Sequence, residues 1–467
     1  MKPIQISDIV RAVSGTLGWG DESAVVDHVV IDSREADKGA LFVPIIGERV
    51  DAHRFIPDVL NQGAACVFSS DHSIQGDAGA CIFVEDTLQA LQDFASWYRN
   101  QFTLPVIGIT GSVGKTTTKE MIGAVLETKY KTVKTLGNLN SQIGLSLMMF
   151  HIEDETEMAV FEMGISMPGE MDRLVDIARP QTAVLTNVGV SHIGNLGSRE
   201  NICREKGKIL TNFGEEGTFY LCGNGDLMEL TKQCIPYERC KGKCKTVYYG
   251  TEEGVLYYGD SIQTMADGQK FMFHYPEGEE EVELSVMGEH NVNNAIVALA
   301  LAIQYGVPMD EAKKALKAYQ PIAMRGVVKE TKGVHIIDDT YNASPDSINS
   351  NLHSLFDYGT GGRKIAVLGD VLELGERSYE LHEGIGKFIL EEKKNARILS
   401  LLVTVGTETV AIHDYVTAHS DIPAIHCEDN KEVVKIVKEN MRADDWILVK
   451  GSRGMHMDEV VNELTKE

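Results

Sequence analysis

The sequence predicts an α/β protein divided into three domains. The chain has 467 residues, which is too long for one ordinary hydrophobic core, so about two to four domains are expected. From about residue 101 onward, short apolar runs alternate with helical stretches, an order typical of parallel sheets. Changes of pattern near residues 100 and 320 indicate domains at residues 1–100, 101–320 and 321–467.

The first expected domain, residues 1–100, is a mixed α/β unit. Four strand-like runs, VVDHVVIDS, ALFVPI, ACVFSS and ACIFVE, lie between helical stretches. The first residues, MKPIQISDIVRAV, carry Asp8 and Arg11 among apolar side chains. They therefore predict an amphipathic helix and not an export signal.

The second expected domain, residues 101–320, combines a mostly parallel sheet with a small antiparallel one. The runs PVIGIT, MAVFEMG and TAVLTNVG each lead into a helix, as in a parallel sheet. Residues 245–286 become rich in strand formers, with TVYYG, GVLYYG and KFMFHY separated by turn residues, which predicts antiparallel strands. Two helices, NNAIVALALAIQYG and DEAKKALKAY, close the region before Pro321.

The third expected domain, residues 321–467, repeats the alternation of strands and helices. VHIIDD, KIAVLGD, LLVTVG, AIHC and WILVKGS are its strand candidates, and a short helix ends the chain. This order predicts a Rossmann-like sheet with helices between the strands.

The composition argues against several classes of protein. A formal net charge of −25 disfavours a nucleic-acid-binding surface. The longest nearly unbroken apolar stretch, Ile143 to Phe150, is too short to span a bilayer, so no membrane insertion is expected. Eight cysteines indicate reduced thiols and a cytoplasmic location. Cys234, Cys240 and Cys244 lack a C-x-x-C pair and a neighbouring histidine, which favours free or packed thiols over a zinc site.

Residues 108–120, GITGSVGKTTTKE, follow an apolar strand and are typical of a phosphate-binding loop. The usual Gly-x-x-x-x-Gly-Lys-[Ser/Thr] spacing would need glycine at position 109, where Ile109 stands. Glycines let the loop turn its amides toward phosphate oxygens, a lysine neutralises the β- and γ-phosphates, and a threonine hydroxyl completes a Mg²⁺ shell. The alternative, a strand-to-helix turn with a solvated lysine, is disfavoured by GKTTT in this position. The candidate residues are Gly111, Ser112, Val113, Gly114, Lys115, Thr116 and Thr117.

Two further residues lie at the ends of predicted strands. Glu162 ends the strand expected beside the loop, where its carboxylate can reach Mg²⁺. His192 follows another strand in TNVGVSHIGNLG. Taken alone, a strand-end glutamate is as often simply solvated, and a loop histidine is more often a hydrogen-bonded surface group than a ligand.

Several stretches together resemble the ATP-dependent Mur ligases of peptidoglycan synthesis. They are GITGSVGKTTT, GNLNSQIG, FEMG, TNVGVSH with REKGK, and MGEHNVNNAIVALA, and the resemblance covers nearly the whole chain. These ligases share a compact G-x-x-G-K-T loop, which accounts for the unusual spacing. IDSREADKGALFVPIIGERVDAHRF, DDTYNASPDS and VLGDVLELG resemble the members that add D-alanyl-D-alanine, and the Asp-Asn-Pro-Arg motif of the members that add the third residue is not found.

The resemblance implies a ligation of D-alanyl-D-alanine to UDP-N-acetylmuramoyl-tripeptide. ATP converts a carboxylate into an acyl phosphate, which the dipeptide amine attacks, giving UDP-MurNAc-pentapeptide, ADP and phosphate. The implied catalytic residues are Lys115, Glu162, His192 and Lys206. Two Mg²⁺ ions are implied, the first held by Thr116 and Glu162, and the second by His192 and a carbamylated Lys206.

Carbamylation of Lys206 is the sharpest of these expectations. Lys206 lies fourteen residues after His192, the spacing at which relatives carry a modified lysine. A desolvated amine has a lowered pKa and can add CO₂, which makes it an anion suited to a metal. Most helix lysines are solvated, and Lys208 is a competing candidate on the same helix.

The resemblance also assigns nucleotide contacts on both sides of an interdomain cleft. Asn291 and Asn294 begin a helix, and Asn294 is implied to read the adenine; an ordinary N-cap cluster is the alternative. Arg325 is the implied phosphate-facing arginine, and Asp339, beside Tyr341, the implied ribose-binding acid. Because Arg325 and Asp339 come from the third domain, we expect hinge closure on ATP binding.

Substrate contacts are implied at both ends of the molecule, with exposed surface loops as the competing explanation. Ser33 and Arg34 are placed near the uridine diphosphate, with Gly47, Arg49 and His53 as weaker candidates. Asn138 is placed near nucleotide or substrate, and Ser141 stands where such ligases often have a second asparagine. For the dipeptide carboxylate, the turn at residues 449–455 offers Lys450, Ser452 and Arg453, and the loop at residues 369–375 is a second candidate wall.

Other functions remain open from the sequence alone. Another ligase of the same fold, such as a folylpolyglutamate synthetase or a different Mur step, would share the ATP site. A P-loop regulatory switch is disfavoured because no Asn-Lys-x-Asp motif follows TAVLTN. A non-catalytic homologue is disfavoured because Lys115, Glu162, His192 and Lys206 are all present. We expect a monomer, and the sequence leaves lysine or diaminopimelate open as the third residue of the tripeptide.

Overall fold

The computed structural model describes residues 1–47, 49–214, 216–235, 244–265, 267–358 and 361–466. These residues form a two-stranded ribbon and three larger sheets of five, nine and six strands. The mixed α/β class predicted from the sequence is confirmed, and each sheet is built from a continuous part of the chain.

The five-stranded sheet lies in the N-terminal part of the chain. Its strand order is β2-β7-β6-β5-β4, and β4 to β7 pair in parallel. The four predicted strand-like runs all contribute strands, and the predicted N-terminal helix is α1. The elements are β1 (Ile4–Gln5), α1 (Ile6–Ala12), β2 (Thr16–Trp19), β3 (Val25–Val26), β4 (His28–Val30), β5 (Ala40–Phe42), η1 (Ala52–Phe55), α2 (Ile56–Asn61), β6 (Cys66–Ser69), β7 (Ala80–Phe83) and α3 (Thr87–Arg99).

The nine-stranded sheet has the order β16-β15-β14-β13-β12-β11-β8-β10-β9. Strands β8 to β13 pair in parallel, β14 pairs antiparallel with β15, and β15 pairs antiparallel with β16. The antiparallel prediction for residues 245–286 is thus confirmed for β14 to β16 but was wrong for TVYYG, which forms β13 and pairs in parallel with β12 and β14. Its strands are β8 (Val106–Thr110), β9 (Thr132–Lys134), β10 (Met158–Glu162), β11 (Thr182–Leu185), β12 (Thr218–Cys222), β13 (Lys245–Gly250), β14 (Tyr257–Met265), β15 (Gly268–Tyr275) and β16 (Gly278–Leu284).

The helices of this central part fix the edge of the sheet where β8, β10 and β11 end. Helix α10 is buried over Ala295–Ala302 and packs on α4, because its apolar residues surround the helix and leave no polar face there. The helices are α4 (Lys115–Leu126), α5 (Gln142–Met149), α6 (Glu170–Ala178), α7 (Ile193–Leu196), α8 (Arg199–Gly207), η2 (Lys208–Leu210), α9 (Leu227–Cys234), α10 (Glu289–Gln304) and α11 (Met309–Ala318).

The six-stranded sheet has the order β17-β18-β22-β19-β20-β21, and only β17 runs antiparallel to its neighbour. All five predicted strands are present as β18 to β22. The elements are β17 (Val327–Thr331), β18 (Val334–Asp339), α12 (Pro345–Asp357), β19 (Lys364–Gly369), η4 (Gly375–Arg377), α13 (Ser378–Lys394), β20 (Leu401–Val405), α14 (Val410–His419), β21 (Ala424–Cys427), α15 (Asn430–Asn440), β22 (Trp446–Lys450), η5 (Arg453–Met455) and α16 (Met457–Thr465).

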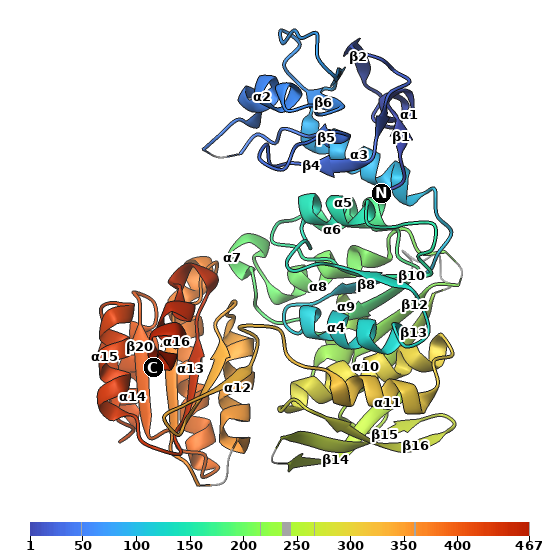
Figure 1. Cartoon of the computed structure of the whole chain (residues 1–467). Helices are drawn as coiled ribbons and strands as arrows, with labels where there is room; N and C mark the ends of the chain where they lie inside the picture. The colour runs from blue at the N-terminus through green and yellow to red at the C-terminus, as the bar shows by residue number, and fades with distance from the viewer. Residues whose placement is uncertain (48, 215, 236–243, 266, 359–360, 467) are drawn as a thin grey trace.

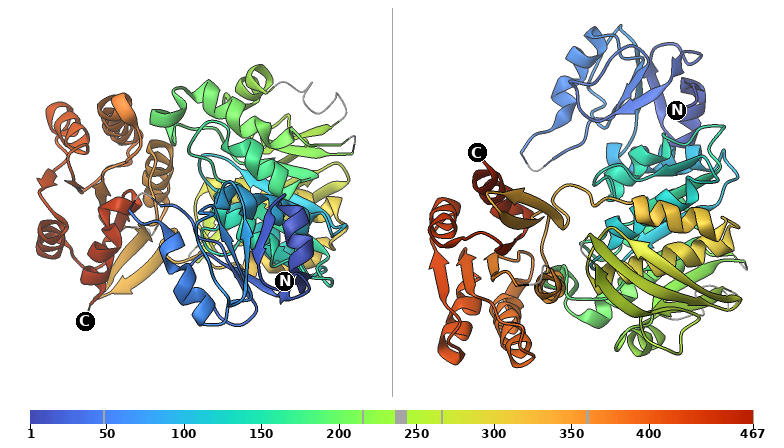
Figure 2. Two further views of the ribbon diagram at one scale, coloured as in Figure 1. Left: turned by 90° about the horizontal axis from the view of Figure 1, so that it is seen from above. Right: turned by 60° about the horizontal axis from the view of Figure 1, so that its bottom comes forward.

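The N-terminal and C-terminal parts lie on different sides of the central part (Figures 1 and 2). The C-terminal part approaches the central part near α7, where Val190 N donates a hydrogen bond to Asp346 Oδ2 at 2.9 Å. Within the described ranges, no helix has the length and apolar character needed to cross a bilayer.

The cysteines differ in part from the expectation of reduced thiols. Cys66, Cys81, Cys203, Cys222, Cys234 and Cys427 are free and buried. Cys244 is disulfide-bonded, so the expectation of reduced thiols throughout was wrong at this position. Cys240, considered with it as a metal ligand, lies outside the described residues.

Candidate active site

The loop between β8 and α4 has the backbone of a tight strand-to-helix turn. Gly111 has φ +151° and Gly114 has φ +86°, conformations that side-chain-bearing residues rarely adopt. A Cβ atom added to Gly111 would lie 1.9 Å from Thr186 Oγ1. Both glycines of the offset motif are therefore required by the geometry of the turn.

The first amides of this loop are bound by a residue that the sequence analysis did not single out. Ser112 N and Val113 N donate to Asn187 Oδ1 at 3.0 and 2.8 Å. Asn187 follows β11. The sequence feature that could have identified it as a loop-binding residue is its position at the end of a strand expected beside the loop. The amides free to face a phosphate are consequently those at the start of α4, where the first-turn N–H groups have no acceptor within the helix.

Two lysines converge behind the loop. Lys115 Nζ and Lys206 Nζ donate to the Gly111 carbonyl oxygen at 2.8 and 3.0 Å. Lys206 is 1% exposed. Burial, followed by repulsion from the Lys115 charge, holds the pKa of Lys206 well below its ordinary 10.5. Burial also lowers the pKa of Lys115. An anion bound here would relieve both penalties.

A pair of oxygen ligands lies at the start of α4. Thr116 Oγ1 donates to Glu162 Oε2 at 2.8 Å, and Asn140 Nδ2 donates to Glu162 Oε1 at 2.7 Å. The Glu162 amide donates to Thr135 Oγ1 at 2.9 Å, which fixes the end of β10. A hydroxyl beside a carboxylate is a donor set that fits Mg²⁺. Asn140 was not singled out from the sequence, although it lies in the quoted GNLN motif.

His192 joins the central part to the C-terminal part. It has φ +61° and precedes α7, and its Nδ1 pairs with Glu373 Oε2 from the loop after β19. Gly194 N donates to Glu373 O at 3.1 Å. The loop at residues 369–375, expected as a wall of the substrate pocket, therefore reaches the predicted metal ligand.

A cavity of about 1060 Å³ gathers the predicted nucleotide-site residues. Its walls come from the carboxyl ends of β8 and β10, from α10 and from the C-terminal sheet, an arrangement common for ligand sites in α/β proteins. Lys206 does not line this cavity, and lies under the loop instead. Gly111, also predicted to bind ATP, is not part of the lining either. The predicted residues that line it are Ser112, Val113, Gly114, Lys115, Thr116, Thr117, Asn138, Ser141, Glu162, His192, Asn291, Asn294, Arg325, Asp339, Tyr341, Lys450, Ser452 and Arg453.

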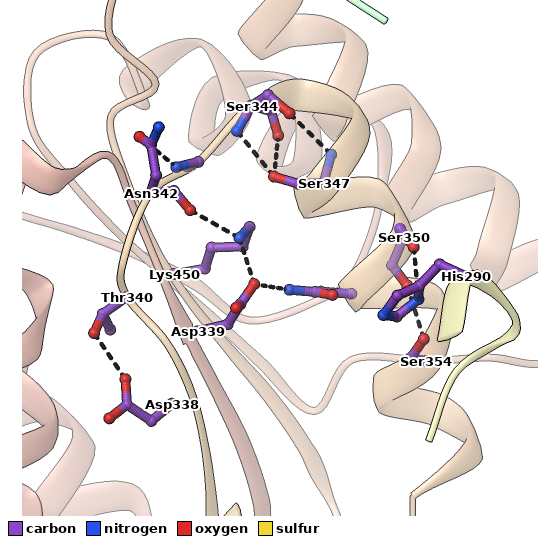
Figure 3. Close-up of polar contacts among 12 residues, drawn as sticks. His290, Asp338, Asp339, Thr340, Asn342, Ser344, Ser347, Ser350, Ser354 and Lys450 are labelled. Atoms are coloured by element: carbon purple, nitrogen blue, oxygen red, sulfur yellow. Dashed lines mark hydrogen bonds and ion pairs between the residues drawn. The ribbon is translucent and has the colours of Figure 1, made fainter. Parts of the chain in front are cut away.

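The C-terminal wall of the cavity is a network around Asp339 (Figure 3). The Asp339 carboxylate pairs with Lys450 Nζ and accepts a hydrogen bond from Asn351 Nδ2. Lys450 Nζ also donates to Asn342 O at 3.0 Å. The ammonium of Lys450, predicted to face a dipeptide, is thus bound to its own chain, and its side chain is 3% exposed.

Arg325 lies over an aromatic ring of the same wall. Its guanidinium carbon is 4.0 Å from the centroid of the Tyr341 ring. Such stacking orients the planar guanidinium without using its N–H donors. The donors of Arg325 therefore remain available to a ligand in the cavity.

The asparagines at the start of α10 are partly engaged with the protein. Asn291 Nδ2 donates to Met287 O at 2.7 Å, and Asn294 Oδ1 accepts from Thr118 Oγ1 at 2.9 Å. Beside them, the ring of His290 contacts Ser350 Oγ at 3.1 Å, and burial lowers the pKa of His290 (Figure 3).

Comparison with known proteins extends over nearly the whole chain. Family models described as Mur ligase family catalytic domain, Mur ligase middle domain and Mur ligase glutamate ligase domain match residues 25–99, 109–302 and 324–453. UDP-N-acetylmuramoyl-tripeptide--D-alanyl-D-alanine ligase of Bacillus subtilis is 36% identical over 98% of both chains. The chain belongs to the Mur ligase family. Two MurF structures, each 29% identical, are similar in fold: one from Acinetobacter baumannii (TM-score 0.90, 100% of both chains) and one from Thermotoga maritima in complex with ADP (TM-score 0.83, 95% of this chain and 98% of that one).

The two candidate lysines of α8 and η2 have opposite surroundings in this Mur ligase. Lys208 Nζ binds Glu205 Oε2 at 2.7 Å and Asp172 Oδ2 at 2.9 Å, and its side chain is partly exposed. Lys206 instead donates to a carbonyl oxygen, that of Gly111, and is buried beside a second cation. Only Lys206 has the desolvated amine that CO₂ addition requires.

The predicted uridine-diphosphate contacts lie outside the cavity, in the N-terminal part of this Mur ligase. Arg34 is exposed and its Nε donates to Asp32 Oδ1 at 2.9 Å. Its neighbour Ser33 is partly buried, and the amide of the exposed Gly47 donates to Val50 O at 3.0 Å. His53, the weaker candidate, is buried, and its Nε2 accepts from Ser70 N at 3.1 Å, which is a structural contact.

Proposed function

We propose that this chain joins D-alanyl-D-alanine to UDP-N-acetylmuramoyl-tripeptide at the expense of ATP, giving UDP-MurNAc-pentapeptide, ADP and phosphate. The main support for an ATP-dependent step is that Lys115, Thr116 and Glu162 of the central part line the same cavity as Arg325 of the C-terminal part. The substrates follow from relatives matched over nearly their full length, whose names specify this tripeptide and this dipeptide.

The three parts of the chain divide the substrates among them. Residues 1–100 hold the UDP-sugar, residues 101–320 bind ATP, and residues 321–467 present the incoming dipeptide. Closure of the C-terminal part over the central part completes the cavity and excludes water from the acyl phosphate. The enzyme acts as a monomer in the cytoplasm, where its nucleotide-linked substrate is made.

To be activated, the tripeptide carboxylate must approach the γ-phosphate of ATP, and both groups are anions. The first-turn amides of α4 and the Lys115 ammonium hold the β- and γ-phosphates, and Arg325 faces the transferred phosphoryl group from the opposite wall. Thr116 and Glu162 would hold one Mg²⁺, and His192 and carbamylated Lys206 would hold the second. Bound Mg²⁺ would supply positive charge between the carboxylate and the phosphate. The dipeptide amine then displaces phosphate from the acyl phosphate.

Lys206 serves this step as a carbamate. Its neutral amine attacks the carbon of CO₂, the nitrogen loses a proton, and the product is an anion beside the Lys115 ammonium. Its burial and lowered pKa support this modification, because a protonated amine cannot attack CO₂. The carbamate also replaces the repulsion between two buried cations by an attraction.

The remaining contacts bind the two ends of the reactants. Asn291 and Asn294 read the adenine, and Asp339 and Tyr341 bind the ribose side. Ser33, Arg34 and Gly47 hold the uridine diphosphate, and Asn138 lies toward the activated end of the tripeptide. At the dipeptide carboxylate, Arg453 is the better cation. Its side chain is 54% exposed and its pairing with Asp458 is long, at 3.5 Å, whereas Lys450 is 3% exposed and bound to Asp339.

An omission assay tests the reaction. Purified protein is incubated with ATP, Mg²⁺, UDP-MurNAc-tripeptide and D-alanyl-D-alanine, and each component is left out in turn. ADP release and the pentapeptide mass should require all four, with one phosphate released per bond formed. ATP turnover with folate and glutamate in place of the murein substrates would instead identify a folylpolyglutamate synthetase, and turnover without any acceptor a P-loop switch.

A further inference from the structure

A loop of the C-terminal part docks onto the turn that carries His192. Glu373 provides both halves of this contact: its side chain pairs with His192 Nδ1, and its carbonyl oxygen accepts from Gly194 N at 3.1 Å. Glu373 has φ +65°, a conformation that costs energy for a non-glycine residue and persists only where surrounding contacts hold it. The loop is therefore shaped for this contact.

The docked surfaces approach as closely as glycine allows. A Cβ atom added to Gly194 would lie 2.8 Å from Glu373 O and 2.8 Å from Gly375 N. Gly194 lies in α7 of the central part, and Gly375 begins η4 of the C-terminal part. Backbone meets backbone here, so the carboxylate of Glu373 is set against the imidazole by main-chain geometry as well as by its own rotamer.

The pairing decides which imidazole nitrogen is left for a ligand. A carboxylate accepts the proton carried by Nδ1, so the neutral ring keeps its lone pair on Nε2. A carboxylate behind a histidine fixes the orientation of the ring and strengthens the other nitrogen as a metal ligand. Glu373 thus gives His192 the carboxylate partner behind the ring that metal-binding histidines in proteins usually have.

We propose that Glu373 is a positioning residue for His192, supplied across the interdomain cleft. His192 acquires the orientation and tautomer of a metal ligand only when the loop after β19 is docked on α7. The affinity of the second metal position is thereby coupled to closure of the C-terminal part. The proposal rests on the metal role given to His192 in the proposed function.

A separate contact keeps the two parts docked when Glu373 is changed. Asp346, in the first turn of α12, accepts a hydrogen bond from Val190 N at 2.9 Å, and a Cβ atom on Gly189 would lie 2.1 Å from Asp346 Oδ2. Removing the Glu373 carboxylate alone therefore perturbs the imidazole while this second contact remains. The effect of a Glu373 variant can be separated from loss of docking.

Metal titration of the full chain tests the proposal without turnover. Mn²⁺, a paramagnetic substitute for Mg²⁺, is titrated into protein saturated with a non-hydrolysable ATP analogue, and free Mn²⁺ is measured by electron paramagnetic resonance. Glu373→Gln should weaken the weaker of two Mn²⁺ sites about tenfold or more, since changes behind a metal ligand commonly cost 10- to 100-fold. Glu376→Gln, which removes the same charge from the neighbouring exposed turn, should leave both sites within about twofold.

A second pair of variants tests the docking itself. Gly194→Ala, which forces the loop away, should weaken the same site to a similar extent, and combining it with Glu373→Gln should add little, because both act through one contact. Gly384→Ala is the control, since a Cβ there meets nothing within 4 Å. Each variant is first checked for an unchanged thermal transition and circular dichroism spectrum.

The possible results are decisive in both directions. An unchanged Mn²⁺ isotherm in folded Glu373→Gln would reduce the contact to a surface ion pair and overturn the proposal. Tighter Mn²⁺ binding would show that Glu373 competes with the metal for His192, which overturns it as well. Because this titration needs no peptide substrate, a failed omission assay with a Glu373-dependent Mn²⁺ site would reject the proposed reaction and leave the positioning role supported.

Discussion

Lys115 and Lys206 donate hydrogen bonds to one acceptor, the carbonyl oxygen of Gly111, at 2.8 and 3.0 Å. Lys115 begins α4 and Lys206 lies near the end of α8, so the loop between β8 and α4 joins two helices through one atom. One carbonyl does not compensate two buried ammonium groups. The two ammonium groups therefore have an unfavourable electrostatic energy in the folded protein. A bound polyphosphate, or a carbamate on Lys206, would reduce it.

Replacing Lys115 by alanine should nearly abolish ADP release. In the proposed function, the ammonium helps to hold the phosphates and to neutralise the transferred phosphoryl group, and loss of one such donor commonly costs about 10²- to 10³-fold in kcat. Lys129→Ala, an exposed lysine on Tyr305 and Gly306 carbonyls, is the control and should keep full activity. A loss of only a few-fold for Lys115→Ala would contradict the phosphate role.

Lys206→Ala should be nearly inactive, and short-chain carboxylic acids should restore part of its activity by taking the place of the proposed carbamate. Lys208→Ala, on the same turn, should retain most of the activity because the partly exposed Lys208 is already paired with Asp172 and Glu205 and does not line the cavity. ADP release is measured with and without acetate or propionate. Full activity of Lys206→Ala would contradict this role for Lys206 and make Lys208 the candidate for the modified lysine.

Lys206→Met should stabilise the uncarbamylated protein at neutral pH by about 1 kcal/mol or more. Folding of the wild type must either bury an unpaired charge or release a proton that the unfolded chain keeps, and the variant avoids both costs. The folded protein binds the Lys206 proton more weakly than the unfolded chain, so unfolding takes up a proton between the lowered pKa and the ordinary 10.5. The free energy of unfolding of the wild type therefore rises with pH across this window. The advantage of the variant should be complete below the lowered pKa of Lys206 and should vanish as the pH approaches 10.5. Denaturant unfolding in CO₂-free buffers at several pH values measures it, and a pH-independent difference would contradict this account.

Asn187→Ala should weaken ATP binding about tenfold, because Ser112 N and Val113 N lose the acceptor that shapes the loop. Asn187→Asp keeps the acceptor and the shape but adds a negative charge near the phosphates, so its affinity should fall further while its stability stays close to that of the wild type. Calorimetric titration with an ATP analogue compares the two. Equal affinities of Asn187→Ala and the wild type for the ATP analogue would show that Asn187 does not contribute to nucleotide binding.

Asp339→Asn should destabilise the protein by about 3 kcal/mol, because it leaves the buried ammonium of Lys450 without its counter-charge. The double variant with Lys450→Met should recover most of the free energy of unfolding but not the activity, since the ribose-side acid is still missing. Urea unfolding and ADP release are measured on the same preparations. If Asp339→Asn had the same free energy of unfolding as the wild type, the Asp339–Lys450 ion pair would not contribute to stability.

Local patterns predicted the strands and their order of alternation with helices. Apolar runs such as VHIIDD and KIAVLGD became β18 and β19, because a strand buried on both faces of a parallel sheet needs a continuous apolar run. The glycines of GITGSVGKTTT predicted the turn before α4 for a similarly local reason, since Gly111 and Gly114 adopt conformations with positive φ.

Contacts between distant segments escaped prediction. Asn187 and Asn140 were not singled out, because an asparagine at a strand end is usually a turn residue until its neighbour in space is known. Lys450 was expected to face a ligand, yet its ammonium is bound to Asp339 and Asn342. The contact of Glu373 with His192 joins residues 181 apart in the chain, and no local signal marks it.

The sequence by itself determined the α/β class, the phosphate-binding turn and the residue types of the site, because backbone conformation and hydrophobic periodicity are local properties. Only the tertiary structure decided which lysine of α8 and η2 is desolvated, which groups already satisfy the loop amides and which carboxylate orients His192. Those properties depend on burial and on the distance between charges, and both are set by how the three sheets pack and not by neighbours in the chain.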